Sequence, residues 1–359
     1  MTLTEVNYYT RRMIPVAIIV ILVLLTIFFS IKLFLLYLAS SSPQRNPVKA
    51  VKVEIDTNFG KIKAPLIPDA VSAKNYTFIL DTFDGTANID SASSSAQIYF
   101  IPAQKASFGF LPQVYSMAKA SGFDTQISQH QVNADIAEFS DGKRNLQVNI
   151  NNFNFTYNFS ITKDDGLSSS NIPEETTIEA SATGFLTSMG SYNEELARGK
   201  RNVIYLKFDQ EKNEVQPLES PDGANMAEVD YFLPDFDSFP VVTSNYYNSP
   251  NYVMIGFTET APIVIKSQVR IFPMIQDKVG VYPIKSSQQA WENLKSDQGY
   301  VVSSSKNEGD IKIKRIYLAY YQPDIYQEYF QPVYVFLGDN KFVAYVTALT
   351  NEYIVQDKK

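Results

Sequence analysis

The chain has 359 residues, of which 45% are hydrophobic and 13% aromatic, so it has room for about two domains and can bury real cores. Its net charge of −7 and the lack of a long Lys/Arg run argue against a nucleic-acid-binding protein, because phosphate contacts need basic side chains. The absence of Cys excludes disulfides, thiolate metal sites and a Cys nucleophile, and a single His excludes multi-His metal sites. A cysteine-free chain suits a bacterial envelope protein.

An uncharged apolar run extends from Met13 to Ile31, and LFLLYLA at 33–39 continues it beyond Lys32. A helix rises 1.5 Å per residue, so this run approaches the thickness of a hydrocarbon core of about 30 Å. The pattern predicts a transmembrane helix over 13–39. A cleaved signal peptide is the alternative, because small residues follow at 38–42.

Basic residues next to this run predict its orientation. Arg11 and Arg12 precede it directly, whereas Arg45 lies farther from its other end. The positive-inside rule then places residues 1–12 in the cytoplasm and the body outside it. Lys32 can extend its ammonium group to the outer interface. The expected localisation is the cell membrane, with a single pass.

After a polar, Pro-containing linker at 40–50, the first unit is expected over 51–165. Alternating apolar residues predict strands near 76–80 and 97–101. The spacing of apolar residues in 107–123 predicts a helix. The dipeptide Asp141-Gly142 lies between two alternating runs and predicts a hairpin.

The second unit is expected over 166–279. Pro173 suits the first turn of a helix that would end near Met189. Strands are predicted at 202–208 and again from 252. Residues 209–250 are rich in Pro, Asp, Asn and Ser, and this composition predicts a long connection with little regular structure.

The third unit is expected over 280–359. Ser286 and Gln289 have the spacing of a capping box and predict a helix over 286–295. In the strand that follows, the apolar alternation slips by one residue at Lys314-Arg315, which predicts a β-bulge. A hairpin is predicted around Gly338. Together the units predict an α+β fold, in which the N-terminal transmembrane helix precedes antiparallel sheet units that are each packed by one helix.

The C-terminal unit resembles a known family. The segments YPIKSSQQAW at 282–291, IYLAYY at 316–321, QPVYVF at 331–336 and FVAYVTAL at 342–349 resemble the PepSY-like modules of the bacterial envelope proteins YycH and YycI. The resemblance covers about 70 residues. It implies an extracytoplasmic, regulatory or binding role through protein contacts.

The titratable residues yield no catalytic or metal site. His130 has no Ser or Asp at a triad spacing, and an exposed loop or strand-edge position is the simpler interpretation. An acidic cluster occurs within 228–237, where it matches the oxygen chemistry of Ca²⁺ sites but lacks their loop pattern. The cluster consists of Glu228, Asp230, Asp235 and Asp237. We expect no catalytic residues, cofactor or metal.

An aromatic-rich stretch supplies the candidate binding residues. These side chains can line a groove for a peptide or a glycan, because aromatic residues give much contact area at small entropic cost. The alternative is that they alternate between the core and cross-strand pairs. The candidates are Tyr317, Tyr320, Tyr321, Tyr326, Tyr329, Phe330 and Tyr334.

The sequence therefore predicts a membrane-anchored, extracytoplasmic binding or regulatory protein that acts through protein–protein contacts and is not an enzyme. Its expected partners are the lipid bilayer and another envelope or membrane protein, and not nucleic acid. The alternatives are an anchored cell-wall glycan hydrolase and a propeptide-like protease inhibitor. The partner, the ligand and the oligomeric state do not follow from the sequence.

Overall fold

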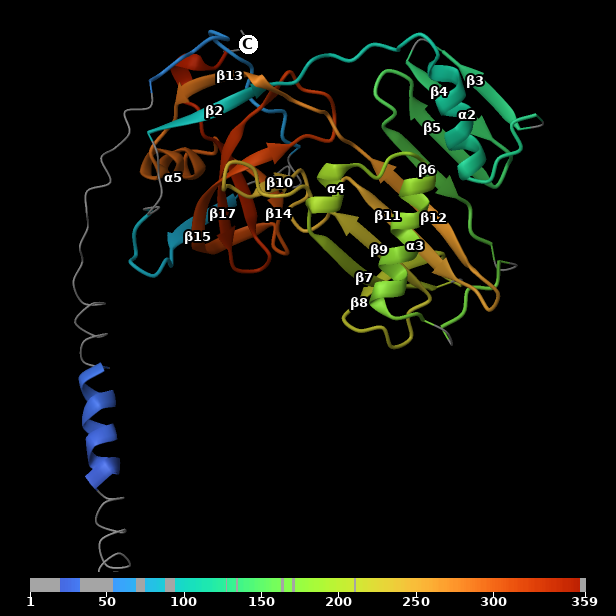
Figure 1. Cartoon of the computed structure of the whole chain (residues 1–359). Helices are drawn as coiled ribbons and strands as arrows, with labels where there is room; N and C mark the ends of the chain where they lie inside the picture. Colours follow the sequence, from blue (N-terminus) through green and yellow to red (C-terminus); the bar gives the residue numbers. More distant parts are fainter. Residues whose placement is uncertain are drawn as a thin grey trace, which may run out of the picture. The chain divides into compact units, whose positions relative to one another are not determined.

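The computed structural model describes residues 20–32, 54–68, 75–87, 94–126, 128–133, 135–162, 165–169, 172–209 and 211–355 (Figure 1). The chain divides into two compact units, Met1–Val53 and Glu54–Lys359.

In the first unit, residues 20–32 are helical and exposed. No helix within the described ranges is long and apolar enough to cross a membrane. This finding contradicts the predicted transmembrane helix over 13–39, and with it the single-pass topology and the cell-membrane localisation. Residues 1–19 and 33–53, including Arg11 and Arg12, lie outside the described residues.

The largest element of the second unit is a nine-stranded antiparallel sheet with the order β3-β4-β5-β6-β12-β11-β9-β7-β8. Its strands are β3 (Gln129–Val132), β4 (Ile136–Ser140), β5 (Arg144–Asn149), β6 (Phe155–Phe159), β7 (Arg201–Asp209), β8 (Glu214–Leu218), β9 (Met226–Tyr231), β11 (Tyr252–Phe257) and β12 (Pro262–Val269). Pro217 in β8 lies on an edge strand, where a missing N–H donor is tolerated.

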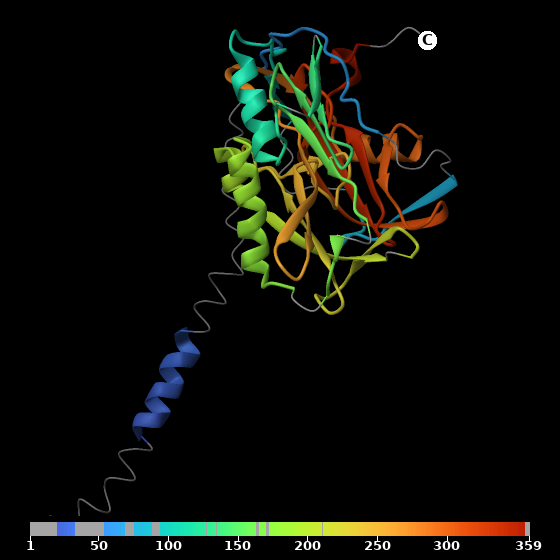
Figure 2. The ribbon, with the colours of Figure 1, turned by 90° about the vertical axis from the view of Figure 1, so that its right-hand side faces the viewer.

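Helices cover one face of this sheet. The helices α2 (Phe110–Ala120), α3 (Glu175–Ser188) and the short α4 (Glu194–Arg198) bury Met117, Leu186 and Leu196 in one core with side chains of the strands. Figure 2 shows α2 and α3 on the same side of the strands.

The opposite face carries an unbroken polar row across eight strands. Residues that pair directly in an antiparallel sheet project to the same face, so the pairing defines the row. In order across the sheet the row runs through Gln131, Glu138, Gln147, Thr156, Gln268, Tyr252, Asp230 and Asn202.

A second sheet has six strands: β1 (Asn75–Leu80), β10 (Val241–Thr243), β14 (Tyr300–Ser303), β15 (Glu308–Gln322), β17 (Pro332–Gly338) and β18 (Val343–Thr347). Both β1 and β10 pair in parallel with β15. Helix α5 (Ser287–Lys295) packs Trp291 and Leu294 against one face of this sheet. A third sheet joins β13 (Ile275–Pro283), β2 (Ser95–Phe100) and β16 (Tyr329–Phe330), and a short 3₁₀ helix, η2 (Asn351–Tyr353), lies near the end of the chain.

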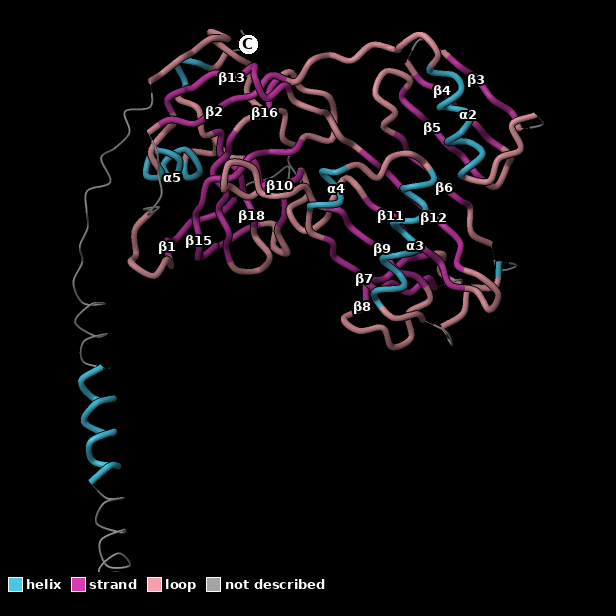
Figure 3. Tube along the Cα trace, viewed as in Figure 1, coloured by secondary structure: helices cyan, strands magenta, loops and turns pink. Residues whose placement is uncertain are grey.

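The fold is thus mostly β, with several sheets, and this corrects the predicted α+β class (Figure 3). The helices do not follow a pattern of one per sheet, because three cover the nine-stranded sheet and none among the described residues belongs to the three-stranded one. Strands far apart in the sequence also pair. β1 and β2 fall within the expected first unit but join β15 and β13.

The predicted irregular connection over 209–250 is wrong, since it contains β8, β9 and β10. Within β9, Ala227, Val229 and Tyr231 face the helices while polar residues alternate with them. The many polar residues of this segment led to the prediction of a loop, but in β9 they form the second, polar face of a strand.

Candidate functional site

Most of the predicted aromatic binding residues belong to the core. Tyr320, Tyr321, Phe330 and Tyr334 are buried, and Tyr317 and Tyr329 are half-buried. Their hydroxyl groups serve the fold: that of Tyr320 donates to Gln97 O, and that of Tyr321 to Leu66 O. Burial raises the pKa of Tyr334 to about 12. The structure therefore does not bring the seven residues together into one groove.

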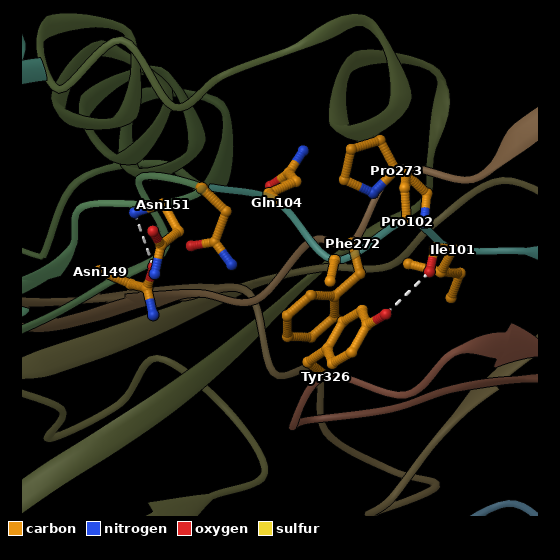
Figure 4. Close-up of a pocket in the computed structure, with 10 residues that line it drawn as sticks. Ile101, Pro102, Gln104, Asn149, Asn151, Phe272, Pro273 and Tyr326 are labelled. Carbon is orange, nitrogen blue, oxygen red and sulfur yellow. Dashed lines mark hydrogen bonds between the residues drawn. The ribbon is translucent and has the colours of Figure 1, made fainter. Parts of the chain in front are cut away.

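Tyr326 is the exception, because it is 42% exposed and lines a hollow of about 170 Å³. We call this the Tyr326 hollow (Figure 4). The ring of Tyr326 lies edge to face against Phe272, with 6.1 Å between the ring centroids, and its hydroxyl donates to Ile101 O at 3.0 Å. Desolvation first, and the negative charge of Glu328 second, raise the pKa of Tyr326. The two rings form a fixed aromatic wall.

Two further hollows adjoin the first. The Arg270 hollow, of about 270 Å³, shares Asn149, Phe272 and Tyr326 with it. The Gln113 hollow, of about 380 Å³, shares Gln104 and Pro273 with it. All three touch Asn152.

Amide side chains dominate the polar lining of these hollows, which we together call the amide groove. The eight amide residues are Gln104, Gln113, Gln147, Asn149, Asn151, Asn152, Asn154 and Asn193. Each primary amide offers donors and an acceptor without charge. The groove can therefore pair with the polar groups of an uncharged ligand while its aromatic wall covers an apolar part.

The end of β5 and the turn that leads to β6 place four of these eight amides, Asn149, Asn151, Asn152 and Asn154. Asn149 Oδ1 accepts from the Asn151 N–H at 2.9 Å, and Asn152 Oδ1 accepts from the Asn154 N–H at 3.0 Å. Such local side-chain bonds are why Asn favours turns. Phe153 adopts a positive φ of 59°, which tightens the turn. Figure 4 shows Asn149 and Asn151 across the hollow from Tyr326.

Within the described residues, several polar groups in the groove have no hydrogen-bond partner. The side chains of Gln104 and Gln113 form no hydrogen bond there, nor do the Nδ2 groups of Asn149 and Asn152. These groups are therefore free to bind a ligand. The run NINNFN at 149–154 was the signal in the sequence that could have indicated this site.

Charge in the groove is sparse and unevenly placed. Arg270 and Asp324 line the Arg270 hollow, and Glu194 and Glu195 line the Gln113 hollow. Burial raises the pKa of Glu195 and lowers that of Arg270. A raised carboxyl pKa is one requirement of a glycan hydrolase, but Glu195 and Asp324 line different hollows.

The other predicted residues lie elsewhere. His130 is exposed on edge strand β3, and its Nε2 lies 3.2 Å from the Tyr115 hydroxyl. Glu228 and Asp230 belong to strand β9, not to a loop, and Asp237 accepts from the Tyr99 hydroxyl at 2.6 Å. No group of three or more metal-ligating side chains occurs among the described residues.

Asp230 is fully buried, and neither carboxylate oxygen has a hydrogen-bond partner among the described residues. Burial first, and the charge of Glu228 second, raise its pKa to about 8; the nearby Ser249 N–H and Asn248 amide oppose this less strongly. The carboxyl group is therefore mostly protonated at pH 7, which is how a protein tolerates a buried unpaired acid.

No family model matches the chain, and no curated protein matches it. A solved structure of an uncharacterized protein from Eubacterium rectale is similar over 81% of this chain and 94% of its own, with 16% sequence identity and a TM-score of 0.32.

Proposed function

We propose that this chain is a binding protein without catalytic activity that recognises a partner protein by holding an extended peptide segment in the amide groove. The observation that carries the proposal is the set of unpaired amide groups beside the aromatic wall of Phe272 and Tyr326. A regulatory role would follow from occupancy of the partner.

An extended peptide matches the chemistry of the groove. Its N–H and C=O groups alternate along the chain, and an amide side chain can donate to one and accept from the other. The wall of Phe272 and Tyr326 offers an apolar surface for one side chain of the ligand. The resemblance of the C-terminal unit to the YycH and YycI modules implies the same kind of role, through protein contacts.

Site-specific photocrosslinking in the native host tests the proposal. A photoreactive phenylalanine derivative replaces Tyr326 in the full chain, and mass spectrometry identifies the crosslinked residues. Tyr247 is a matched control position, since it is 43% exposed against 42% for Tyr326 and does not line the groove. We expect one contiguous segment of one partner from position 326 and not from position 247.

The variant Gln104→Arg provides the second half of the test. Gln104 is exposed and its side chain has no hydrogen bond within the described residues, so a larger side chain blocks the groove without disturbing the fold. A synthetic peptide of the crosslinked segment should bind the purified protein and lose affinity with Gln104→Arg. Equal crosslinking at both positions, or tight binding of cell-wall oligosaccharides in place of the peptide, would contradict the proposal.

A further inference from the structure

Arg270 is a cation held rigidly beside the groove. It follows the last residue of β12, and its guanidinium group lines the Arg270 hollow of about 270 Å³. Nη1 donates to Phe155 O at 3.0 Å and to Val269 O at 3.2 Å, and Nη2 donates to Thr156 Oγ1 at 2.7 Å. These bonds fix the guanidinium group against the polar row of the nine-stranded sheet.

The charge of this group is not neutralised by a close partner. Arg270 forms no ion pair with any carboxylate in the described part of the chain. The hydrogen-bond acceptors that it contacts are two carbonyl groups and a hydroxyl group, all neutral. Half-buried cations in proteins are ordinarily paired, because desolvation of an unpaired charge is costly.

The guanidinium group also keeps donors available. A guanidinium carries five N–H donors, and Nε forms no hydrogen bond with the described residues. Nε and Nη2 lie on the same edge of the group, the edge that binds a carboxylate through two parallel hydrogen bonds. Such bidentate pairs are stronger than bonds between neutral groups.

Among the described residues, Asp324 is the one carboxylate that lines this hollow. Its Oδ2 accepts from Ser244 Oγ, and its buried Oδ1 has no hydrogen-bond partner within the described residues. Its negative charge acts on Arg270 through space but without contact. Asp324 therefore weakens the binding of an anion in the hollow, but it does not occupy Nε or the second N–H of Nη2, whose other N–H donates to Thr156.

We propose that the Arg270 hollow binds a carboxylate of the peptide segment, which Arg270 holds through Nε and Nη2. This inference rests on the proposed function, because the carboxylate belongs to the segment in the amide groove. The group is either the C-terminal carboxylate of the segment or an Asp or Glu side chain, since both offer the same pair of oxygens.

Defined peptide pools test the inference on the full chain. The four pools are random N-acetylated octapeptides, with a free or an amidated C-terminus and with or without Asp and Glu. Mass spectrometry measures retention on the immobilised protein. We expect carboxylate-bearing pools to be retained about tenfold or more above the amidated pool without acids, the difference of a charge-assisted pair. Preference for free C-termini or for acidic side chains identifies the source.

Three variants assign the preference. Arg270→Gln should abolish it, and Arg270→Lys, which keeps the charge but loses the planar fork, should reduce it. Lys266→Gln is the charge-matched control, because Lys266 is exposed on the neighbouring part of β12 and does not line the hollow. Equal retention of all pools by the native chain and by Arg270→Gln overturns the inference. If Gln104→Arg still weakens binding, the proposed function survives that result.

A direct measurement decides the case in which no pool is retained. N-acetylglycine and its amide are titrated into the native protein while the NMR signal of the Arg270 Nε–H group, assigned by its loss in Arg270→Lys, is followed. A saturable shift with the acid and none with the amide supports the carboxylate site even where the peptide proposal fails. No shift with either overturns it.

Discussion

The side chain of Asn154 forms two hydrogen bonds with the backbone of Ile271. Its Nδ2 donates to the carbonyl oxygen at 3.1 Å, and its Oδ1 accepts from the N–H at 3.0 Å. The amide thus replaces a rung of the ladder between β6 and β12, beyond the end of their backbone pairing. Through this contact the turn that carries the groove amides is fixed to the segment that carries Phe272.

The variant Asn154→Leu tests this link. It leaves the N–H and C=O groups of Ile271 without partners, which should lower the free energy of unfolding by about 2 kcal/mol. Urea denaturation measures the change. Asn158→Leu, at a half-buried position on the same strand, is the control and should change stability by less than about 0.5 kcal/mol. Equal effects of the two variants would show that the link to Ile271 contributes nothing specific.

Asp230 predicts an unusual pH dependence of stability. Its pKa is about 8 in the folded protein, well above the ordinary value of 3.8, so the folded state binds the proton more tightly. Stability from this group is complete below pH 3.8 and falls as the pH rises toward 8, by about 1.4 kcal/mol per unit. In Asp230→Asn this component should vanish, so the variant gains stability over the native chain with rising pH. Urea denaturation from pH 4 to pH 9 measures it.

The control for that series is Asp222→Asn, which removes the same charge at an exposed position. Its difference from the native chain should stay nearly constant with pH. If the Asp230→Asn difference is constant too, the Asp230 carboxyl is ionised in the folded protein at all these pH values.

Local signals in the sequence predicted local structure well. The capping box of Ser286 and Gln289 is confirmed at the start of α5. The register shift between Ile313 and Arg315 confirms the predicted bulge in β15, and the hairpin around Gly338 joins β17 and β18. Each of these features depends on residues a few positions apart, so the local sequence is enough to predict them.

Long-range pairing and the site did not follow from such signals. The parallel pairing of β1 with β15 joins residues more than 200 positions apart, which no periodicity records. Tyr320 and Tyr334 looked like groove residues because burial cannot be read from aromatic content. The groove amides were missed because Asn149 and Asn152 read as ordinary turn residues until the fold placed Tyr326 beside them.

Replacing Lys285 by an apolar residue is expected to stabilise the protein. Lys285 is 9% exposed, and Nζ donates to Thr347 O at 3.1 Å. Burial lowers its pKa to about 8 from the ordinary value of 10.5. The charged form therefore destabilises the folded state below pH 8, and stability rises between pH 8 and 10.5. Lys285→Met should raise the free energy of unfolding by about 1 to 3 kcal/mol at pH 7 and remove that rise. Thermal and urea denaturation measure both effects.

Lys312→Met is the control for an exposed lysine, and its stability should match the native chain within about 0.5 kcal/mol. A loss of stability in Lys285→Met would mean that the single bond to Thr347 O outweighs the cost of burying the ammonium group.

Replacing Asp324 is expected to raise the affinity for a ligand that carries a carboxylate. Because the carboxylate of Asp324 lines the same hollow as Arg270, it repels a ligand carboxylate there. In Asp324→Asn the repulsion disappears, while the side-chain oxygen can still accept from Ser244, so the local fold is kept. We expect N-acetylglycine and free-acid peptides to bind several-fold more tightly to this variant, with a smaller gain at high salt because salt screens the repulsion.

Calorimetric titration at two salt concentrations measures these affinities, and Asp277→Asn, outside the hollow, controls for net charge. Unchanged affinity in Asp324→Asn would place the carboxylate away from Arg270, since no anion bound to that guanidinium can be insensitive to the charge beside it.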